Sequence, residues 1–272
     1  MQSFEANGVV TAYHKAGRGA PLVLLHGGEA DHAMFGGLAR AMNDHFTVIA
    51  YDQRDSGATR NPALPYSLAD LADDAAALIR GLGHDRAHVM GTSLGGLIAQ
   101  VLAARHPDCI DRLILSSTRK VNKSPLEVNA DAFRTLASYR ADTASNAPKI
   151  AEFFFPPDCL RDRPELIEIF RGNSRDDGQK ARRGAILAQM VGADLSNFDR
   201  PTLLLAGSED RLIPNAETFA IARDLKRVET RVIEQVGHVS SIQAPERVAE
   251  AAIAFLTSRK EGEPTTRGEQ HG

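Results

Sequence analysis

The sequence predicts an α/β fold, with a mostly parallel sheet that carries helices on both faces. Six short apolar runs each lead to a glycine or a polar turn, and they are mostly unbroken rather than alternating, which is typical of strands buried on both faces. These runs cover residues 21–25, 46–51, 87–90, 113–115, 202–206 and 230–233. Segments with a helical spacing of apolar residues lie between several of these runs. This alternation of strand and helix favours a doubly wound sheet.

Four helices are expected within this alternation, over residues 67–81, 94–105, 215–225 and 245–256. Ser67, with Asp70 three residues later, resembles a capping box. Pro245 stands in a first-turn position, where its missing N–H costs nothing. The first twenty residues are expected to add an antiparallel pair of strands with a turn near Asn7 and Gly8.

The alternation fails between about residues 119 and 197. This stretch reads as helices over residues 125–139, 148–155, 164–170 and 180–191, with breaks at 156–157 and 172–173. We therefore expect a core made of residues 1–118 and 198–258, with a helical cap inserted at 119–197. Residues 259–272 contain almost no apolar side chains and are expected to form a disordered tail.

Composition places the chain among ordinary globular proteins. Of 272 residues, 43% are hydrophobic and 25% charged, and the net charge of -3 gives no reason to expect a nucleic acid or a membrane as partner. Cys109 and Cys159 form no metal-ligand cluster and are expected to be reduced thiols. With no signal-peptide pattern and no long apolar run, we expect a cytoplasmic protein with a small-molecule substrate, and a homodimer is one possible assembly.

The sharpest local motif is GTSLG at residues 91–95, between a predicted strand and a predicted helix. This is the setting of a nucleophile elbow, in which a tight turn holds the serine hydroxyl clear of the sheet. Ser93 is therefore the candidate nucleophile. The alternative is a serine that simply caps the following helix.

A serine nucleophile needs a base, and His238 is the best placed of nine histidines because it follows the last predicted strand. The acid that orients this base should follow the strand between them. Asp210 is favoured over its neighbour Glu209, because only one of two successive side chains can face the site. The resulting chain order of serine, acid and histidine is the order found in α/β enzymes that carry this elbow.

An oxyanion hole requires backbone N–H groups. Leu94 supplies one as the residue after the serine, and Gly28, in the loop HGGE at residues 26–29, is expected to supply the other. We expect His26 to brace this loop rather than to act in catalysis. No metal ligands and no cofactor are expected.

Several further residues remain open between two interpretations. Residues 153–155 (FFF) either line the substrate pocket or pack the insertion on the core; Phe153 and Phe154, together with Gly27 and Val239, are the expected substrate contacts. The charges of residues 52–57 (DQRDSG), with Arg54 paired to Asp52 or Asp55, are expected to form a structural turn. Arg182 and Arg183 could bind an anionic substrate, but a solvated helix face is the default.

Together these motifs resemble the α/β-hydrolase family over almost the whole chain to about residue 258. The matching pieces are HGG at 26–28, DQRDSG at 52–57, GTSLGG at 91–96, SEDRLIP at 208–214 and GHVSSIQAPE at 237–246. The resemblance implies an eight-stranded sheet, a helical cap between strands six and seven, and no cofactor.

Within that family the motifs look most like the enol-lactonase and small-esterase branch. Ser93 argues against dehalogenases and epoxide hydrolases, which use an aspartate nucleophile. The resemblance implies hydrolysis of a carboxylic ester or lactone through an acyl-enzyme. Two alternatives stay open: a hydrolase that cleaves a C–C bond in a diketone-type ring-cleavage product, and a ligand-binding receptor with slow turnover.

Overall fold

The computed structural model describes residues 1–172 and 175–258, and they fold around one eight-stranded sheet. The strand order is β1-β2-β4-β3-β5-β6-β7-β8, with β2 antiparallel to both β1 and β4 and all other pairs parallel. The strands are β1 (Gln2–Ala6), β2 (Val9–Gly17), β3 (Ala20–Leu25), β4 (Phe46–Tyr51), β5 (Ala87–Thr92), β6 (Ile110–Ser116), β7 (Thr202–Gly207) and β8 (Val228–Ile233). The predicted mostly parallel sheet, and its antiparallel start, are confirmed.

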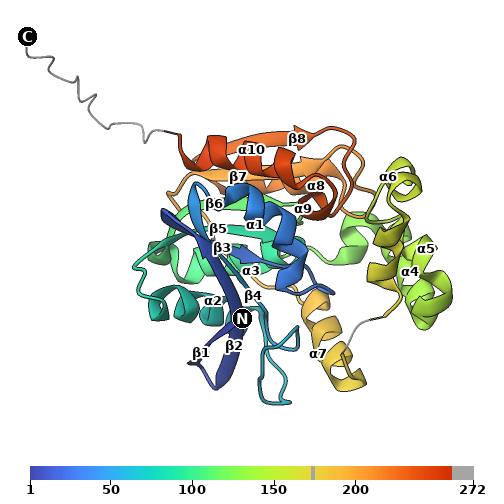
Figure 1. Cartoon of the computed structure of the whole chain (residues 1–272), viewed down its shortest axis with the longest axis horizontal. Helices are drawn as coiled ribbons and strands as arrows, with labels where there is room; N and C mark the ends of the chain where they lie inside the picture. Colours follow the sequence, from blue (N-terminus) through green and yellow to red (C-terminus); the bar gives the residue numbers. More distant parts are fainter. Residues whose placement is uncertain (173–174, 259–272) are drawn as a thin grey trace, which may run out of the picture.

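Helices cover both faces of this sheet (Figure 1). The core helices are α1 (Gly36–Met42), α2 (Leu68–Gly81), α3 (Leu94–Arg105), α8 (Asn215–Phe219), α9 (Ser240–Gln243) and α10 (Pro245–Leu256). One apolar cluster packs α2 and α3 on the sheet, and a second packs α1 and α10 on the opposite face. The capping box expected at Ser67 and Asp70 is present at the start of α2.

Two core helices differ from the prediction. The sequence pattern missed α1, which begins with two glycines and so has weak intrinsic helix preference. Packing explains the second of these glycines, because a Cβ at Gly37 would lie only 3.0 Å from Pro245 Cγ at the start of α10. The helix expected over residues 215–225 is split into α8 and a 3₁₀ helix, Ala220–Asp224.

The segment between β6 and β7 contains helices in its described part and no strand. They are α4 (Pro125–Tyr139), α5 (Thr143–Ala151), α6 (Pro157–Asp162) and α7 (Asp177–Ala188), with a 3₁₀ helix at Pro164–Phe170. In Figure 1, α4 to α6 lie together beyond one end of the sheet, and α7 lies apart from them. The division into core and cap stays a prediction, and the tail expected at 259–272 falls outside the described residues.

The start of α5 was predicted wrongly. A helix expected over 148–155 begins at Thr143 instead, because the Asp142 carboxylate accepts a hydrogen bond from Ser145 N (3.1 Å), and Pro148 lies inside the helix. A similar cap extends α7, where Asp176 accepts from Gln179 N at 2.8 Å. Polar caps set these ends, and the apolar spacing alone does not reveal them.

Neither thiol is part of a disulfide: Cys109 is buried and Cys159 half-buried. Within the described ranges, no helix combines the length and apolar character needed to cross a bilayer.

Candidate active site

Ser93 sits in the sharp turn that joins β5 to α3. Its backbone is left-handed in φ (55°, with ψ -115°), a strained conformation for a residue with a side chain. The turn is held by Ser93 N donating to Ser116 O (3.0 Å) and by Thr118 Oγ1 donating to Ser93 O (2.8 Å). The side chain of Ser93 makes no capping hydrogen bond to α3. The alternative of a simple helix-capping serine is therefore wrong.

Glycines bring α3 against the sheet at this turn. A Cβ at Gly95 would lie 2.0 Å from Leu25 O, and one at Gly91 would lie 2.2 Å from Gly95 O. Only residues without a side chain fit these positions. The close approach fixes where the first turn of α3, and with it the N–H of Leu94, lies relative to β3.

His238 and Asp210 form a buried pair at the carboxyl edge of the sheet. Asp210 follows β7, His238 follows β8, and His238 Nδ1 lies 2.9 Å from Asp210 Oδ2. Only 2% of His238 and 9% of Asp210 are exposed. Asp210 Oδ1 accepts from the backbone N–H groups of Leu212 and Ile213, both at 2.9 Å, so the carboxylate is fixed in orientation.

The second ring nitrogen of His238, Nε2, is buried and has no hydrogen-bond partner in the described part of the chain. The ring of Phe154 meets the imidazole edge-on, with centroids 5.6 Å apart. Glu209, the alternative acid, is exposed and is not the carboxylate that contacts His238. The arrangement leaves one imidazole nitrogen available in a water-poor site.

The glycine loop after β3 reaches both the serine and the insertion. A Cβ at Gly27 would lie 3.8 Å from Ser93 Cβ, so the loop runs directly beside the nucleophile candidate. A Cβ at Gly28 would lie 3.1 Å from the side chain of Leu187 in α7. The loop is thus enclosed between α3 and α7.

His26 braces this loop, as expected. Its Nδ1 lies 2.8 Å from Gly27 O, and its Nε2 accepts from Gln53 N at 3.1 Å. Because a backbone N–H can only donate, the proton of the neutral ring must be on Nδ1. Complete burial and the nearby charge of Arg183 hold the pKa of His26 well below its usual value.

Arg183 was predicted to lie on a solvated helix face, and this is wrong. Only 3% of it is exposed, and its guanidinium donates to Gly28 O (3.0 Å) and Gln53 Oε1 (3.0 Å). Burial lowers the pKa of Arg183 to about 10, so it remains a cation at neutral pH. Arg182 is also engaged, in a bidentate pair with Asp55 at 2.7 and 2.8 Å.

The sequence contained a signal for this buried arginine. Arg183 shares a helix face with Ile186 and Leu187, at the i+3 and i+4 positions that stack along one side of a helix. Both partners contact the core. A charged residue in such an apolar stripe is a candidate for a buried, fully bonded group.

The charges of residues 52–57 are structural, but their partners differ from the expected ones. Arg54 pairs with Asp74 of α2 (2.7 Å) rather than with Asp52 or Asp55. Asp52 is fully buried and accepts from both N and Nδ1 of His32 at 2.8 Å. The motif therefore links the end of β4 to α2, to the segment at His32 and, through Asp55 and Arg182, to α7.

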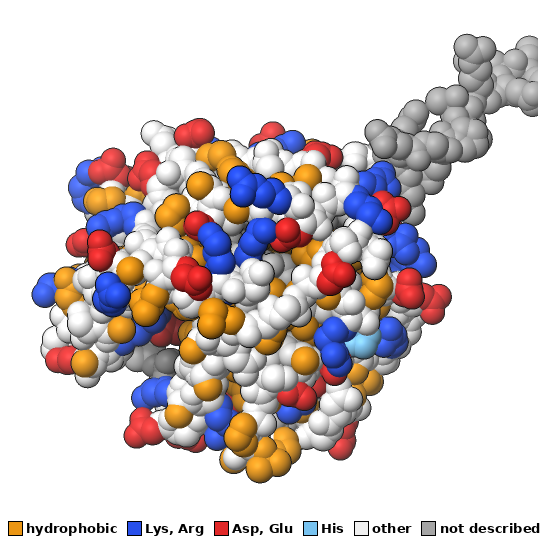
Figure 2. All heavy atoms as spheres, turned by 180° about the vertical axis from the view of Figure 1, so that it is seen from behind, with side chains coloured by type: hydrophobic (Ala, Val, Ile, Leu, Met, Phe, Trp, Pro, Cys, Tyr) orange, Lys and Arg blue, Asp and Glu red, His pale blue; other side chains and the backbone are white. Residues whose placement is uncertain are grey.

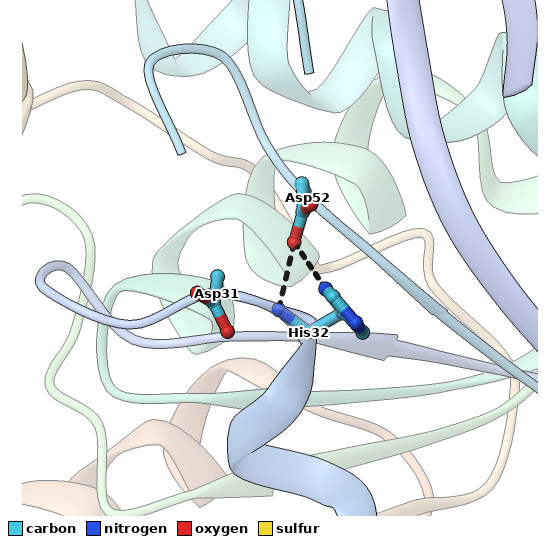
Figure 3. A group of neighbouring side chains, drawn as sticks. All are labelled: Asp31, His32 and Asp52. Carbon is cyan, nitrogen blue, oxygen red and sulfur yellow. Dashed lines mark hydrogen bonds and ion pairs between the residues drawn. The ribbon is translucent and has the colours of Figure 1, made fainter. Parts of the chain in front are cut away.

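Figure 3 shows the group of Asp31, His32 and Asp52, whose ligand-type atoms lie within 4.8 Å of one another. Its dashed lines join one oxygen of Asp52 to the backbone N and to the ring Nδ1 of His32. The other oxygen of Asp52 accepts from Ala58 N, and Asp31 caps Ala33 N, both at 2.8 Å. Both carboxylates thus already hold loop backbone, and the His32 ring is bonded to one of them.

The aromatic run of the insertion divides between different surroundings. Phe154 packs on His238 and stacks on Phe170, with centroids 4.8 Å apart. Phe153 instead lines a surface cavity with Tyr139 of α4 and Arg211 of the loop after β7. Val239 is half-buried beside Phe154, and its N–H donates to Phe154 O at 3.4 Å. Of the expected substrate contacts, Phe154 and Val239 therefore lie beside His238, the candidate catalytic base.

Comparison with known proteins gives a consistent picture. A model of the α/β hydrolase fold family matches residues 20–245. A protein from Caulobacter sp. (strain K31), named as a provisional carbamate hydrolase, RutD, is 29% identical over 228 residues, covering 80% of this chain and 83% of that protein. The 3-oxoadipate enol-lactonase 2 of Acinetobacter baylyi is 27% identical over 220 residues, covering 78% and 79%.

Among solved structures, a thermophilic esterase from Thermogutta terrifontis superposes with a TM-score of 0.80 at 28% identity, covering 94% of this chain and 98% of that one. A structure described as an N-acyl homoserine lactone degrading enzyme, Est816, gives 0.81 at 26% identity, covering 93% and 100%. In both comparisons the similarity thus covers more than nine tenths of the chain.

Proposed function

The chain belongs to the α/β-hydrolase fold family and is a hydrolase, and we propose that it cleaves a carboxylic ester or lactone through an acyl-enzyme on Ser93. The observation that carries this proposal is the buried pair of His238 and Asp210, 2.9 Å apart, with the other ring nitrogen unpartnered among the described residues. An imidazole oriented in this way can take the proton of a serine hydroxyl.

In the acylation step, Ser93 Oγ attacks the carbonyl carbon while its proton passes to His238 Nε2. Asp210 stabilises the imidazolium that forms. The oxyanion accepts hydrogen bonds from the N–H groups of Gly28 and Leu94, and the N-terminal end of α3 adds its positive dipole. Collapse of the tetrahedral intermediate expels the alkoxide, which takes the proton from His238.

In the deacylation step, water gives a proton to His238 Nε2 and attacks the acyl carbon. The second tetrahedral intermediate breaks its bond to Ser93 Oγ, which regains the proton, and the acid is released. Each proton passes among serine, histidine, substrate and water, so the proposed cycle needs no cofactor.

The proposed substrate is a small molecule held beside the base. Phe154 and Val239 offer apolar surface there, and Gly27 allows close approach to the serine. Nucleic acid and membrane are not proposed as partners. In support, Figure 2 shows the face opposite to that of Figure 1. On this face Lys and Arg side chains are interspersed with Asp and Glu, with no continuous basic region.

The test compares wild type with Ser93→Ala and with Ser138→Ala, a control at an exposed serine of α4. Hydrolysis of p-nitrophenyl acetate, p-nitrophenyl butyrate and a panel of aliphatic lactones is followed under saturation. We expect wild type and Ser138→Ala to be equally active and Ser93→Ala to be inactive but folded. A fluorophosphonate should label wild type once, on Ser93, by peptide mass spectrometry.

Other outcomes point to the alternatives. Cleavage of a vinylogous diketone without cleavage of esters or lactones would replace ester hydrolysis by C–C hydrolysis. Tight binding of a small molecule with negligible turnover of all three substrate classes would favour the receptor. Near wild-type esterase activity in Ser93→Ala would remove Ser93 from the mechanism.

A further inference from the structure

Arg183 is a cation of the insertion that binds the loop beside the nucleophile. Its Nη2 donates to Gly28 O (3.0 Å) and Gly27 O (3.4 Å), and its Nε donates to Gly28 O (3.2 Å). Its Nη1 donates to Gln53 Oε1 (3.0 Å). The guanidinium thus donates to the glycine loop and to Gln53, and its bond to Gly28 joins residues 155 positions apart in the sequence.

These bonds hold the carbonyls on both sides of the Gly28 N–H: the contact with Gly27 O bears on the peptide that joins Gly27 to Gly28, and the two contacts with Gly28 O bear on the next peptide. The carbonyl of the first peptide, Gly27 O, contacts Arg183, His26 Nδ1 (2.8 Å) and Ala30 N (3.4 Å). The described chain has no cis peptide bond, so the N–H of Gly28 points away from that carbonyl. Glycines rotate freely unless held, and three donors on one carbonyl remove that freedom.

The same loop faces Ser93, because a Cβ at Gly27 would lie 3.8 Å from Ser93 Cβ. A cation bonded to a peptide carbonyl also polarises the peptide and makes its N–H a stronger donor. In a buried setting the positive charge itself favours a nearby oxyanion. Orientation and charge therefore act in the same direction.

Arg183 has no ion pair within the described residues, whereas its neighbour Arg182 binds the Asp55 carboxylate. Burying a cation on neutral carbonyls is a costly way to dock a helix. The side chains of Ile186 and Leu187 already pack α7 on the core. The cost is understandable if the charge serves the loop rather than the docking.

We propose that Arg183 is a positioning residue that sets the Gly28 N–H for the oxyanion, so that the hole is complete only when α7 of the insertion is docked. This rests on the proposed function, since it assumes an oxyanion formed at Ser93. Arg183 itself does not touch the reacting atoms in this assignment. It acts through the Gly27–Gly28 peptide.

The experiment measures kcat and KM for p-nitrophenyl butyrate in wild type, Arg183→Met, Arg183→Lys and the matched control Arg182→Met. A second readout is the inhibition constant of an aryl trifluoromethyl ketone, which forms a tetrahedral oxyanion adduct with an active serine. Thermal unfolding of each variant monitors the fold.

We expect Arg183→Met to lower kcat by about 10²-fold, in line with the loss of one oxyanion donor, with KM within about threefold of wild type. The ketone should bind weaker by a similar factor. Arg183→Lys should recover part of the loss, because an ammonium still donates to carbonyls but lacks the planar fork. Arg182→Met should lower the melting temperature while leaving kcat within about threefold.

Equal losses of kcat in Arg182→Met and Arg183→Met would overturn the proposal, since both would then act only by docking α7. Unchanged ketone affinity in Arg183→Lys together with lost turnover would also overturn it, and this readout remains available if Arg183→Met does not fold. A wild type that neither hydrolyses the ester nor binds the ketone would overturn the proposed function as well. An active wild type with either pattern above overturns only the role of Arg183.

Discussion

The imidazole of His238 is held by Asp210 through one nitrogen only, with Nδ1 2.9 Å from Oδ2 and Nε2 unpartnered in the described part of the chain. A carboxylate accepts but does not donate, so this contact places the ring proton on Nδ1 and leaves the lone pair on Nε2. Asp210 is itself held by two backbone N–H groups. The pair therefore selects both a tautomer and a ring orientation before any substrate binds.

Asp210→Asn tests the choice of tautomer. The amide oxygen of asparagine can still accept from Leu212 N and Ile213 N, so the loop after β7 should keep its shape. Its NH₂ group would face His238 Nδ1 and favour the proton on Nε2. We expect kcat to fall on the order of 10⁴-fold, measured with p-nitrophenyl butyrate.

Asp210→Ala is the companion variant, because it removes the loop contacts as well. It should lose comparable activity and also unfold at a lower temperature than Asp210→Asn. If Asp210→Asn retained activity within tenfold of wild type, the carboxylate would not be orienting a catalytic base.

Ser93→Gly tests the strain at the elbow. With φ at 55°, Ser93 occupies a region that costs about 1–3 kcal/mol for a residue with a side chain. Glycine removes that strain, at a cost of about 0.5–1 kcal/mol in backbone entropy. We expect Ser93→Gly to be more stable than Ser93→Ala by about 1 kcal/mol in urea denaturation, with both variants inactive. Equal stability would mean that the turn stores no strain at this residue.

Gly95→Ala tests the close approach of α3 to β3. Its methyl group would lie 2.0 Å from Leu25 O, and neither backbone can move without displacing the elbow. We expect a loss of about 3 kcal/mol or more in the free energy of unfolding. The control is Gly184→Ala on the exposed side of α7, where nothing lies within 4 Å; it should gain about 1 kcal/mol through helix propensity. A mild effect of Gly95→Ala would show that α3 can shift.

Sequence patterns predicted the sheet because its central strands, β3 to β7, are mostly buried on both faces and so appear as apolar runs. They also predicted the pairing of Asp210 with His238, since each follows a strand and the carboxyl ends of parallel strands meet at one edge. The role of Ser93 with this pair stays a prediction. No such rule places the insertion. Two of its helices begin at Asp caps that apolar spacing does not detect.

The contacts that the sequence did not predict are long-range and polar. Arg183 bonds to loops that precede it by about 130 to 155 residues, and Arg54 pairs with Asp74 instead of a neighbour in its own motif. Such pairs depend on how helices pack across the sheet. Helix α1 was missed for a related reason, because the glycine at its second position, Gly37, is explained by the approach of Pro245.

The bonding of His26 predicts a pH dependence of stability. Burial, reinforced by the charge of Arg183, lowers the pKa of His26 well below 6.5 in the folded protein, whereas an unfolded histidine titrates near 6.5. Below that pH the unfolded chain binds one proton more than the folded chain, so stability is full above pH 6.5 and is lost as the pH falls. From this group alone, the free energy of unfolding should drop between pH 7.5 and 5.5 by at most about 1.4 kcal/mol, the limit set by the pKa of the unfolded histidine.

His26→Asn removes the titrating ring, and its pH-induced loss in urea denaturation should be smaller than that of wild type by up to this amount. Protonating His26 would also replace the acceptor of Gln53 N by a donor, so the folded ring should show no titration by NMR down to pH 5.5. Identical losses in wild type and variant, together with a ring that titrates near 6.5, would show that His26 accepts a proton in the fold. The glycine loop would then not depend on the neutral Nδ1–H tautomer.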